Sequence, residues 1–328
     1  MQEVTIGIDI GGTSTKYGLV DTLGNVLFQG KIPTQSHDTF EGFIDELTTV
    51  IRDGIDFTDH KLLGVGVGAP NANYYRGTIE NATNLRWKGT LPLADLIRAA
   101  FDVPVVVTND ANAAAVGEMI FGGAQDMRDF IVITLGTGLG GGIVSNGELV
   151  NGYNGYAGEL GHLSIHYGNG RSCGCGRKGC LETYVSATGI KRTVYKMLAD
   201  YMEASELRGV SFDNLSTKMI TEAANRGDVI ANKAFEYTGR ILGTKLADTV
   251  FHTNPQAIFL FGGLSLAGDL IFKPTIEHLE RNLVPFYKGR VEILPSKLQN
   301  QSAPIIGASS LVMDMIRKDK IRTLSNPS

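Results

Sequence analysis

The sequence predicts an α/β fold in two lobes, and three observations support this. The chain has 328 residues and a mass of 35.2 kDa, about twice the length of a common single domain. Hydrophobic residues make up 43% and charged residues 20%, which is typical of a globular chain. The order β-β-β-α-β-α begins at Val4 and begins again at Asp129. Because no low-complexity linker separates the halves, we expect a duplicated core whose lobes pack across an active-site cleft.

The first half opens with a strand over 4–10, where β-branched residues alternate. Phe40, Phe43 and Leu47 recur at helical spacing and predict the first helix. The polar segment from Pro70 to Trp87 predicts a long loop. By the same criteria we expect further strands at 16–20, 26–30, 63–68 and 103–108, and helices at 40–51, 93–101 and 111–121.

The second half repeats this order with a glycine-rich turn at 136–142. The sequence Ile8-Asp-Ile-Gly-Gly-Thr13 is echoed by Ile133-Thr-Leu-Gly-Thr-Gly138. We place a smaller N-terminal lobe at 1–112 plus 306–328 and a larger C-terminal lobe at 113–305. The expected strands are 129–135, 143–146, 148–150, 256–261 and 291–294, with helices within 186–253 and at 307–316.

Composition argues against several classes of partner. Thirty basic and 34 acidic residues give a net charge of −4 without runs of like charge, so we expect neither nucleic acid nor an anionic membrane as partner. Apolar stretches stop well short of a bilayer span of about 20 residues. The first residues, Met1–Val4, lack a basic region, so we expect no signal peptide. The cysteine count of three is odd and argues against a disulfide framework, which favours a reducing cytoplasm.

Glycine turns at three strand ends suggest a phosphate-binding role. Backbone N–H groups can hold phosphate oxygens only where no Cβ blocks the approach. Hydroxyls of nearby threonines can donate as well, and an adjacent carboxylate can hold Mg²⁺ through water. Ordinary hairpin turns, which also favour glycine, are the alternative for any single turn. The candidates are Asp9, Gly11, Gly12 and Thr13, then Gly136, Thr137 and Gly138, then Gly262 and Gly263.

All three cysteines lie within eight residues, and one histidine precedes them. His162, Cys173, Cys175 and Cys180 follow the pattern Gly-His-x10-Cys-x-Cys-x4-Cys. Three thiolates and an imidazole are the ligands of a tetrahedral structural Zn²⁺ site. Free thiols beside a bystander histidine are the alternative. A redox role is less favoured, because Cys-x-Cys is not the Cys-x2-Cys redox arrangement.

The paired glycine turns resemble those of the actin-like ATPase and sugar-kinase superfamily, which has a ribonuclease H-like fold. The segments Glu159-Leu-Gly-His162, Cys173-Gly-Cys175-Gly and Gly179-Cys180-Leu-Glu182 resemble the signature of the ROK family of repressors and sugar kinases. The resemblance covers nearly the whole chain and is strongest to the glucokinases of the family. It implies binding of ATP with Mg²⁺ and a hexose, a structural Zn²⁺, and assembly as a homodimer or homotetramer.

The resemblance also implies roles for individual residues. Asn109-Asp110-Ala-Asn112-Ala matches the catalytic strand end of the family, so Asp110 is the expected general base and Asn109 a sugar contact. Read without the resemblance, Asn109 and Asp110 would more often be helix N-caps. The further sugar contacts that the resemblance implies are Asn84, Glu159, His162 and Glu182. His162 would use one ring nitrogen for zinc and the other for a sugar hydroxyl.

The expected reaction is transfer of the γ-phosphoryl group of ATP to the 6-hydroxyl of glucose. Many relatives have Gly-x-Pro-Gly where this chain has Gly68-Ala-Pro-Asn71, which puts the identity of the sugar in doubt. Kinases for N-acetylglucosamine, N-acetylmannosamine or fructose are the alternatives within the class. A repressor would need a helix-turn-helix ahead of the strand that begins at Val4, for which we expect no room. A non-catalytic sugar-binding regulator is the remaining alternative. Trp87 fits a place in the hydrophobic core as well as a role as a platform on which a ligand stacks. Lys16 is expected to be an exposed strand residue.

Overall fold

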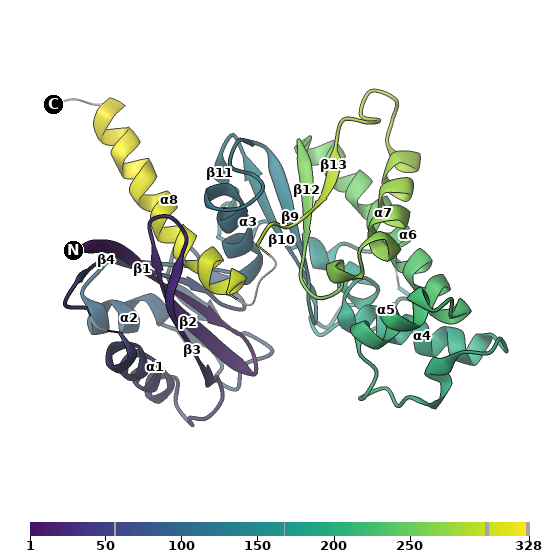
Figure 1. Cartoon of the computed structure of the whole chain (residues 1–328), viewed down its shortest axis with the longest axis horizontal. Helices are drawn as coiled ribbons and strands as arrows, with labels where there is room; N and C mark the ends of the chain where they lie inside the picture. Colours follow the sequence, from purple (N-terminus) through teal and green to yellow (C-terminus); the bar gives the residue numbers. More distant parts are fainter. Residues whose placement is uncertain (56, 167, 299–301, 326–328) are drawn as a thin grey trace. The chain divides into compact units, whose positions relative to one another are not determined.

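The computed structural model describes residues 1–55, 57–166, 168–298 and 302–325, and these divide into two compact units (Figure 1). Unit 1 comprises Met1–Met127, Gly142–Gly158 and Lys297–Ser328, and unit 2 comprises Arg128–Gly141 and Glu159–Ser296. The lobe boundaries predicted above stay a prediction. The compact units group helix α3 (Asp110–Ile120) with the N-terminal segments.

Unit 1 is built on a five-stranded sheet in the order β3-β2-β1-β4-β8. The first three strands are antiparallel neighbours, and β4 and β8 run parallel to β1. Residues on β1 alternate between the two faces, so Ile6 and Ile8 join a core that includes Phe43 and Leu47 of α1. The strands of this sheet are β1 (Gln2–Ile10), β2 (Ser14–Asp21), β3 (Val26–Pro33), β4 (His60–Gly68) and β8 (Val105–Thr108), and the helices of unit 1 besides α3 are α1 (Phe40–Gly54), α2 (Leu93–Phe101) and α8 (Ala303–Ser325).

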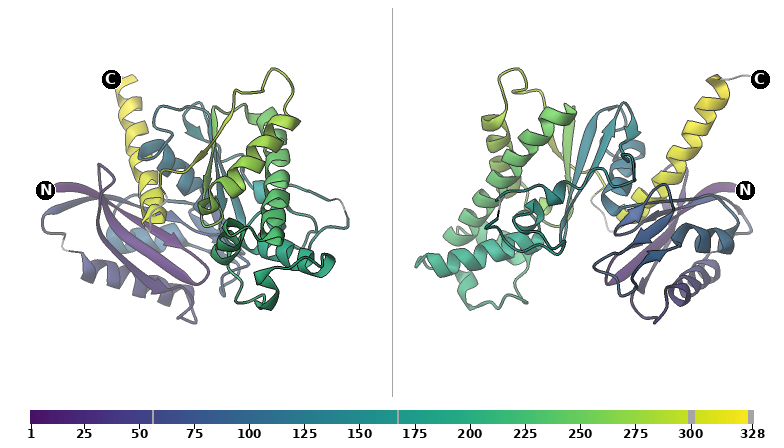
Figure 2. Two further views of the ribbon diagram at one scale, coloured as in Figure 1. Left: turned by 45° about the vertical axis from the view of Figure 1, so that its right-hand side comes forward. Right: turned by 180° about the vertical axis from the view of Figure 1, so that it is seen from behind.

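The opposite face of this sheet is covered by α8, as both views of Figure 2 show. The helix approaches so closely that a Cβ at Gly7 would overlap the carbonyl oxygen of Ile305. A Cβ at Gly66 would likewise overlap the carbonyl oxygen of Ala308. Glycine in these two strands is therefore a packing requirement for the C-terminal helix.

A second sheet has the order β11-β10-β9-β12-β13. Numbered within its own half of the chain, each sheet follows the order third, second, first, fourth, fifth, so the predicted duplication is confirmed. In this sheet, β12 pairs in parallel with both β9 and β13. The strands are β9 (Phe130–Leu135), β10 (Leu139–Ser145), β11 (Glu148–Leu149), β12 (Ala257–Phe261) and β13 (Glu292–Pro295).

Of these strands, β9, β12 and β13 belong to unit 2, whose other elements are helices, with α6 packed along α7. Short 3-10 helices, η1 (Leu160–His162) and η2 (Leu181–Thr183), precede them. In the described part of the chain, none of the helices combines the length and the apolar character that a bilayer span needs. The helices are α4 (Ala187–Asp200), α5 (Thr217–Asn225), α6 (Val229–Thr253) and α7 (Asp269–Asn282), with short η3 (Glu206–Gly209) and η4 (Ser265–Ala267).

Three expectations about elements are corrected. The predicted loop up to Trp87 contains two short strands, β5 (Ala72–Asn73) and β6 (Thr78–Glu80), which form a three-stranded sheet with β7 (Thr90–Leu91), and these strands are too short to show a periodic pattern. The glycine turn of the second half is shorter than 136–142, because β10 begins at Leu139 and its glycines are strand residues. The last helix extends well beyond the predicted 307–316.

Trp87 belongs to the core of unit 1. Its side chain is 7% exposed and stacks on Phe43 with ring centroids 5.1 Å apart. Phe40 contacts the same indole edge-on at 5.4 Å. The structure therefore favours the core interpretation of this residue over a ligand platform.

Candidate functional site

The carboxyl ends of three neighbouring strands in unit 1 bring two acidic residues together. Asp9 on β1 pairs in register with Gly68 on β4, which pairs with Thr108 on β8. A Cβ added at Gly68 would lie 3.8 Å from Asp9 Oδ1 and 3.6 Å from the Cα of Asp110. The two carboxylates therefore flank Gly68 at the edge of the sheet where ligands bind in open α/β folds.

Asn109 and Asp110 form the N-terminus of α3. The Oδ1 atom of Asn109 accepts a hydrogen bond of 2.7 Å from the backbone N–H of Asn112, so Asn109 is the N-cap. Asp110 Oδ1 accepts from the N–H of Ala111 at 2.9 Å. The capping role that the sequence suggested for Asn109 is thus present, and its Nδ2 group is not used by the cap.

Asn112 is a polar residue at this helix start that the sequence analysis gave no role. Its side chain is 1% exposed, and its Nδ2 donates to Thr108 Oγ1 at 3.1 Å. Its Oδ1 is buried without a hydrogen-bond partner among the described residues. The motif Asn109-Asp-Ala-Asn112-Ala contains it, but an asparagine in an alanine-rich turn predicts neither burial nor a partner.

The two acidic residues influence each other. Desolvation by surrounding protein raises the pKa of Asp110, although the residue itself is open to solvent. Desolvation, and secondly the charge of Asp110, raise the pKa of Asp9 to about 7, while Lys16 opposes the shift. Two neighbouring carboxylates with raised pKa values suit a divalent cation, whose charge would favour their ionised forms. Mg²⁺ prefers carboxylate and water oxygens as ligands. Lys16 is partly buried, so it is less exposed than predicted.

The first glycine turn follows β1 and lies against Asn84. A Cβ added at Gly12 would lie 3.0 Å from the carbonyl oxygen of Asn84 and 3.3 Å from its Cβ. Thr34 Oγ1 donates to the carbonyl oxygen of Gly11 at 2.7 Å. Gln35 Nε2 donates to the carbonyl oxygens of both Gly12 and Asn84. Thr34 and Gln35 were absent from the sequence-based list of candidates.

The second glycine turn follows β9 in unit 2 and lies against Glu182. The N–H of Gly136 donates to the carbonyl oxygen of Gly138 at 3.1 Å, which closes the turn. A Cβ at Gly138 would lie only 2.6 Å from Glu182 Oε2. Thr137, between the two glycines, is exposed. The third glycine element, Gly262–Gly263, lies at the neighbouring strand end, where a Cβ at Gly262 would be 2.8 Å from the carbonyl oxygen of Leu135.

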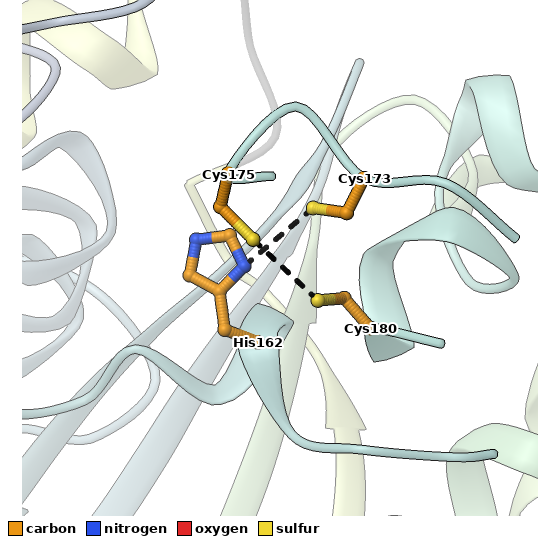
Figure 3. A group of neighbouring side chains, drawn as sticks. All are labelled: His162, Cys173, Cys175 and Cys180. Carbon is orange, nitrogen blue, oxygen red and sulfur yellow. Dashed lines mark hydrogen bonds between the residues drawn. The ribbon is translucent and has the colours of Figure 1, made fainter. Parts of the chain in front are cut away.

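The predicted zinc ligands converge in unit 2 (Figure 3). The candidate ligand atoms of His162, Cys173, Cys175 and Cys180 all lie within 4.8 Å of one another. The sulfurs of Cys175 and Cys180 are 3.7 Å apart, and Cys173 Sγ is 3.8 Å from His162 Nδ1. Tetrahedral Zn²⁺ with Zn–S bonds of about 2.3 Å sets its sulfurs about 3.8 Å apart. Donor set and spacing therefore both fit a zinc ion.

Carboxylates border this cluster on two sides. Glu182 Oε1 is 2.8 Å from Cys173 Sγ and 3.8 Å from His162 Nδ1. Glu159 Oε2 is 3.9 Å from the other ring nitrogen, His162 Nε2. The structure thus brings the predicted sugar contacts of unit 2 together, with the two nitrogens of His162 facing different neighbours.

Asn71 has a left-handed backbone with φ of 49°. Glycine occupies such positions most readily, and asparagine tolerates them best among residues with a side chain. Its exposed side chain donates from Nδ2 to the carbonyl oxygen of Glu80 at 3.2 Å. Asparagine in place of glycine is therefore compatible with this left-handed backbone and adds a hydrogen bond to the small sheet.

Comparison with known proteins places the whole chain in one family. The model of the ROK family matches residues 5–315. A glucokinase of Halalkalibacterium halodurans is 37% identical over 318 residues, which cover 94% of each chain. A ROK family glucokinase from Streptomyces griseus, solved in complex with glucose and AMPPNP, is 36% identical with a TM-score of 0.80 and covers 95% of this chain and 99% of that one.

A repressor is among the relatives as well. The xylose repressor of Caldicellulosiruptor bescii is 28% identical over 95% of this chain, which spans 78% of the repressor. The solved neighbours have the actin-like ATPase fold of ROK sugar kinases, so the predicted fold class is confirmed. From the family match and the near full-length identity to glucokinases, it follows that this chain is a member of the ROK family.

Proposed function

We propose that the protein is an ATP-dependent hexose kinase that transfers the γ-phosphoryl group of ATP to the 6-hydroxyl of glucose. The observation that carries this proposal is the near full-length likeness, at 36% identity, to a glucokinase structure that holds glucose and AMPPNP. The strand-end carboxylates Asp9 and Asp110 and the three glycine elements support it, because they are the groups that phosphoryl transfer requires.

Asp110 is the proposed general base. Its carboxylate accepts the proton of the 6-hydroxyl as that oxygen bonds to the γ-phosphorus, and the bond to ADP breaks. The raised pKa of Asp110 suits this role, because a more basic carboxylate accepts a proton more readily. By family resemblance, the backbone N–H groups of Gly11, Gly12 and Thr13 and those of the turns at 136–138 and 262–263 hold phosphate oxygens. Mg²⁺, which Asp9 would hold through water, neutralises phosphate charge when bound.

The sugar hydroxyls are assigned to amides, carboxylates and one imidazole. In unit 1, Asn84 and the Nδ2 group of Asn109 can donate to hydroxyls. In unit 2, Glu159 and Glu182 can accept, and His162 Nε2 can donate. Each hydroxyl both donates and accepts, so this mixed set suits a hexose.

The Cys/His cluster is proposed as a structural Zn²⁺ site with His162, Cys173, Cys175 and Cys180 as ligands. Coordination through His162 Nδ1 would leave the proton on Nε2, which fixes that nitrogen as a donor. The metal would hold η1 and η2 in place and so position the sugar contacts they carry. By family resemblance we further propose a cytoplasmic homodimer or homotetramer with no nucleic-acid or membrane partner.

The test is a coupled assay of ADP release with ATP and Mg²⁺ across glucose, N-acetylglucosamine, N-acetylmannosamine, mannose, fructose and allose. Turnover dominated by glucose is the expected result. Turnover dominated by another sugar would support the kinase activity but refute glucose as its substrate. Zinc-loaded, folded protein that is silent with every sugar would refute the kinase and leave a sugar-binding regulator.

A further inference from the structure

One side chain in unit 1 connects the first glycine turn to the predicted sugar-contacting loop. Gln35 lies between β3 and α1, and its Nε2 group donates to the carbonyl oxygen of Gly12. The same group donates to the carbonyl oxygen of Asn84 at 3.2 Å. A side-chain amide has two N–H bonds in one plane, so a single NH₂ group can serve both acceptors at once.

The backbone on either side of Gln35 is fastened to the same two regions. The N–H of Thr34 donates to the carbonyl oxygen of Thr13 at 3.1 Å, which ties the loop to the glycine turn. Arg86, two residues after Asn84, donates to the carbonyl oxygens of Gln35 at 3.4 Å and His37 at 3.0 Å. Hydrogen bonds to both regions therefore hold the backbone of this loop in place, and the exposed Gln35 side chain extends from it.

We propose that Gln35 is a positioning residue that couples nucleotide binding at the first glycine turn to hexose binding at Asn84. This inference rests on the proposed function for the identity of the two ligands. Gln35 itself touches neither ligand in this scheme. It acts through the carbonyl oxygens of Gly12 and Asn84.

The coupling follows from the shared peptide unit. The carbonyl of Gly12 and the N–H of Thr13 belong to one peptide bond, so a phosphate oxygen that accepts from this N–H makes the carbonyl a stronger acceptor. The tighter bond to Gln35 then fixes its NH₂ plane and directs the second N–H at Asn84.

The experiment measures binding rather than turnover. Calorimetry gives the Kd of glucose with and without saturating Mg²⁺–AMPPNP, and the Kd of Mg²⁺–AMPPNP with and without glucose. In the wild type we expect each ligand to tighten the other by the same factor, about fivefold or more. In Gln35→Ala that factor falls toward one, while each binary Kd changes less than the factor does. Gln35→Glu keeps the side-chain length but removes both donors, so it should lose coupling as well.

Gln29→Ala is the matched control, because Gln29 is another exposed glutamine of unit 1 and accepts from Ser302 instead. It should keep the wild-type coupling factor. A wild type without coupling, or two Gln35 variants that keep it, would overturn the inference. Failure of the proposed function is recognised separately: the wild type would then not bind glucose at all, and the coupling would be measured with whichever hexose of the panel binds.

Discussion

The two glycine turns occupy the same place in two sheets of the same strand order, yet different groups support them. The turn at Gly11–Gly12 lies against the backbone of Asn84 and is held by hydrogen bonds from Thr34 and Gln35. The turn at 136–138 lies against the flexible carboxylate of Glu182, which borders the Cys/His cluster. The duplicated fold thus provides a glycine turn in each sheet. The residues that contact the two turns, Asn84 and Glu182, come from segments that are not equivalent in the duplication.

This difference indicates where each turn can tolerate change. Behind Gly12 stands a backbone carbonyl, which cannot rotate away without moving the chain. Behind Gly138 stands the end of a side chain, which can rotate. A side chain added at Gly12 should therefore disturb the structure more than a side chain added at Gly138.

The largest expected effect is the loss of turnover when Asp110, a residue of unit 1, is replaced. Asp110→Asn removes the proposed base but keeps the shape and the hydrogen bond to Ala111, so turnover should fall by about 10²–10⁴-fold with glucose binding retained. ADP release and calorimetry measure the two quantities. Asp95→Asn, an exposed carboxylate on α2, is the control.

The same residue should shape the acid side of the pH profile. Asp110 must be ionised to accept a proton, and its pKa is raised above the ordinary 3.8, so kcat/KM should fall with decreasing pH at a value above 3.8. Asp110→Asn should remove this limb from the residual activity. Turnover of Asp110→Asn near the wild-type level would take the base role from this residue.

Loss of zinc should affect mainly unit 2. Metal analysis should find about one zinc per chain in the wild type, and Cys180→Ser should lower that content and raise the KM for glucose by about tenfold or more. The Kd of Mg²⁺–AMPPNP should change less than the KM for glucose. His166→Ala, in the same segment but outside the cluster, should keep the metal. Unchanged zinc content in Cys180→Ser would reject this ligand set.

A pair of alanine substitutions tests the comparison directly. Gly12→Ala places a Cβ 3.0 Å from a backbone oxygen, so the KM values for both ATP and glucose should rise by about tenfold. Gly138→Ala displaces only the end of Glu182, so the rise should be smaller and largely limited to glucose. In Gly136→Ala the new Cβ would have no atom of the described residues within 4 Å apart from its chain neighbours, so the Tm should stay unchanged. Equal rises in KM for Gly12→Ala and Gly138→Ala would contradict the proposed difference between the two glycine turns.

The smallest expected effect concerns the hairpins that follow each turn. Asp21 is buried, which opposes ionisation, but hydrogen bonds from Asn25 and from the backbone N–H of Leu23 outweigh burial and lower its pKa. A lowered pKa contributes stability above the unfolded value near 3.8, and that stability is lost as the pH falls through the folded value. Asp21→Asn should therefore cost about 1 kcal/mol at pH 7 and almost nothing near pH 2.

Thermal unfolding across pH checks this last prediction, with Asp102→Asn as control because a left-handed C-cap suits asparagine equally. The other hairpin turns at Asn146–Gly147, two uncharged residues with positive φ, so its turn should contribute no comparable pH dependence. A pH-independent loss in Asp21→Asn would contradict the role of the charge.

The sequence was sufficient for features with a periodic or chemical pattern. Alternating β-branched residues predicted β1, and the close spacing of Cys173, Cys175 and Cys180 predicted a cluster that the structure assembles. Gln35 and Asn112 could not be found in this way. Gln35 acts through a hydrogen bond to a residue distant in sequence and Asn112 through one to a residue four positions earlier, and no residue type or spacing marks either contact. The strands of the small sheet were missed because two or three residues carry no period.

The C-terminal helix that covers the N-terminal sheet has a consequence for synthesis on the ribosome. The face of β1 and β4 that carries Gly7 and Gly66 is complete once β8 has emerged, but α8 begins only at Ala303. At about 5–20 residues per second, roughly 10–40 s separate these events. During that interval the sheet of unit 1 stands open on one face while the segments of unit 2 are being made. The first-made part of the chain therefore waits longest for its packing partner, and the last residues translated complete its core.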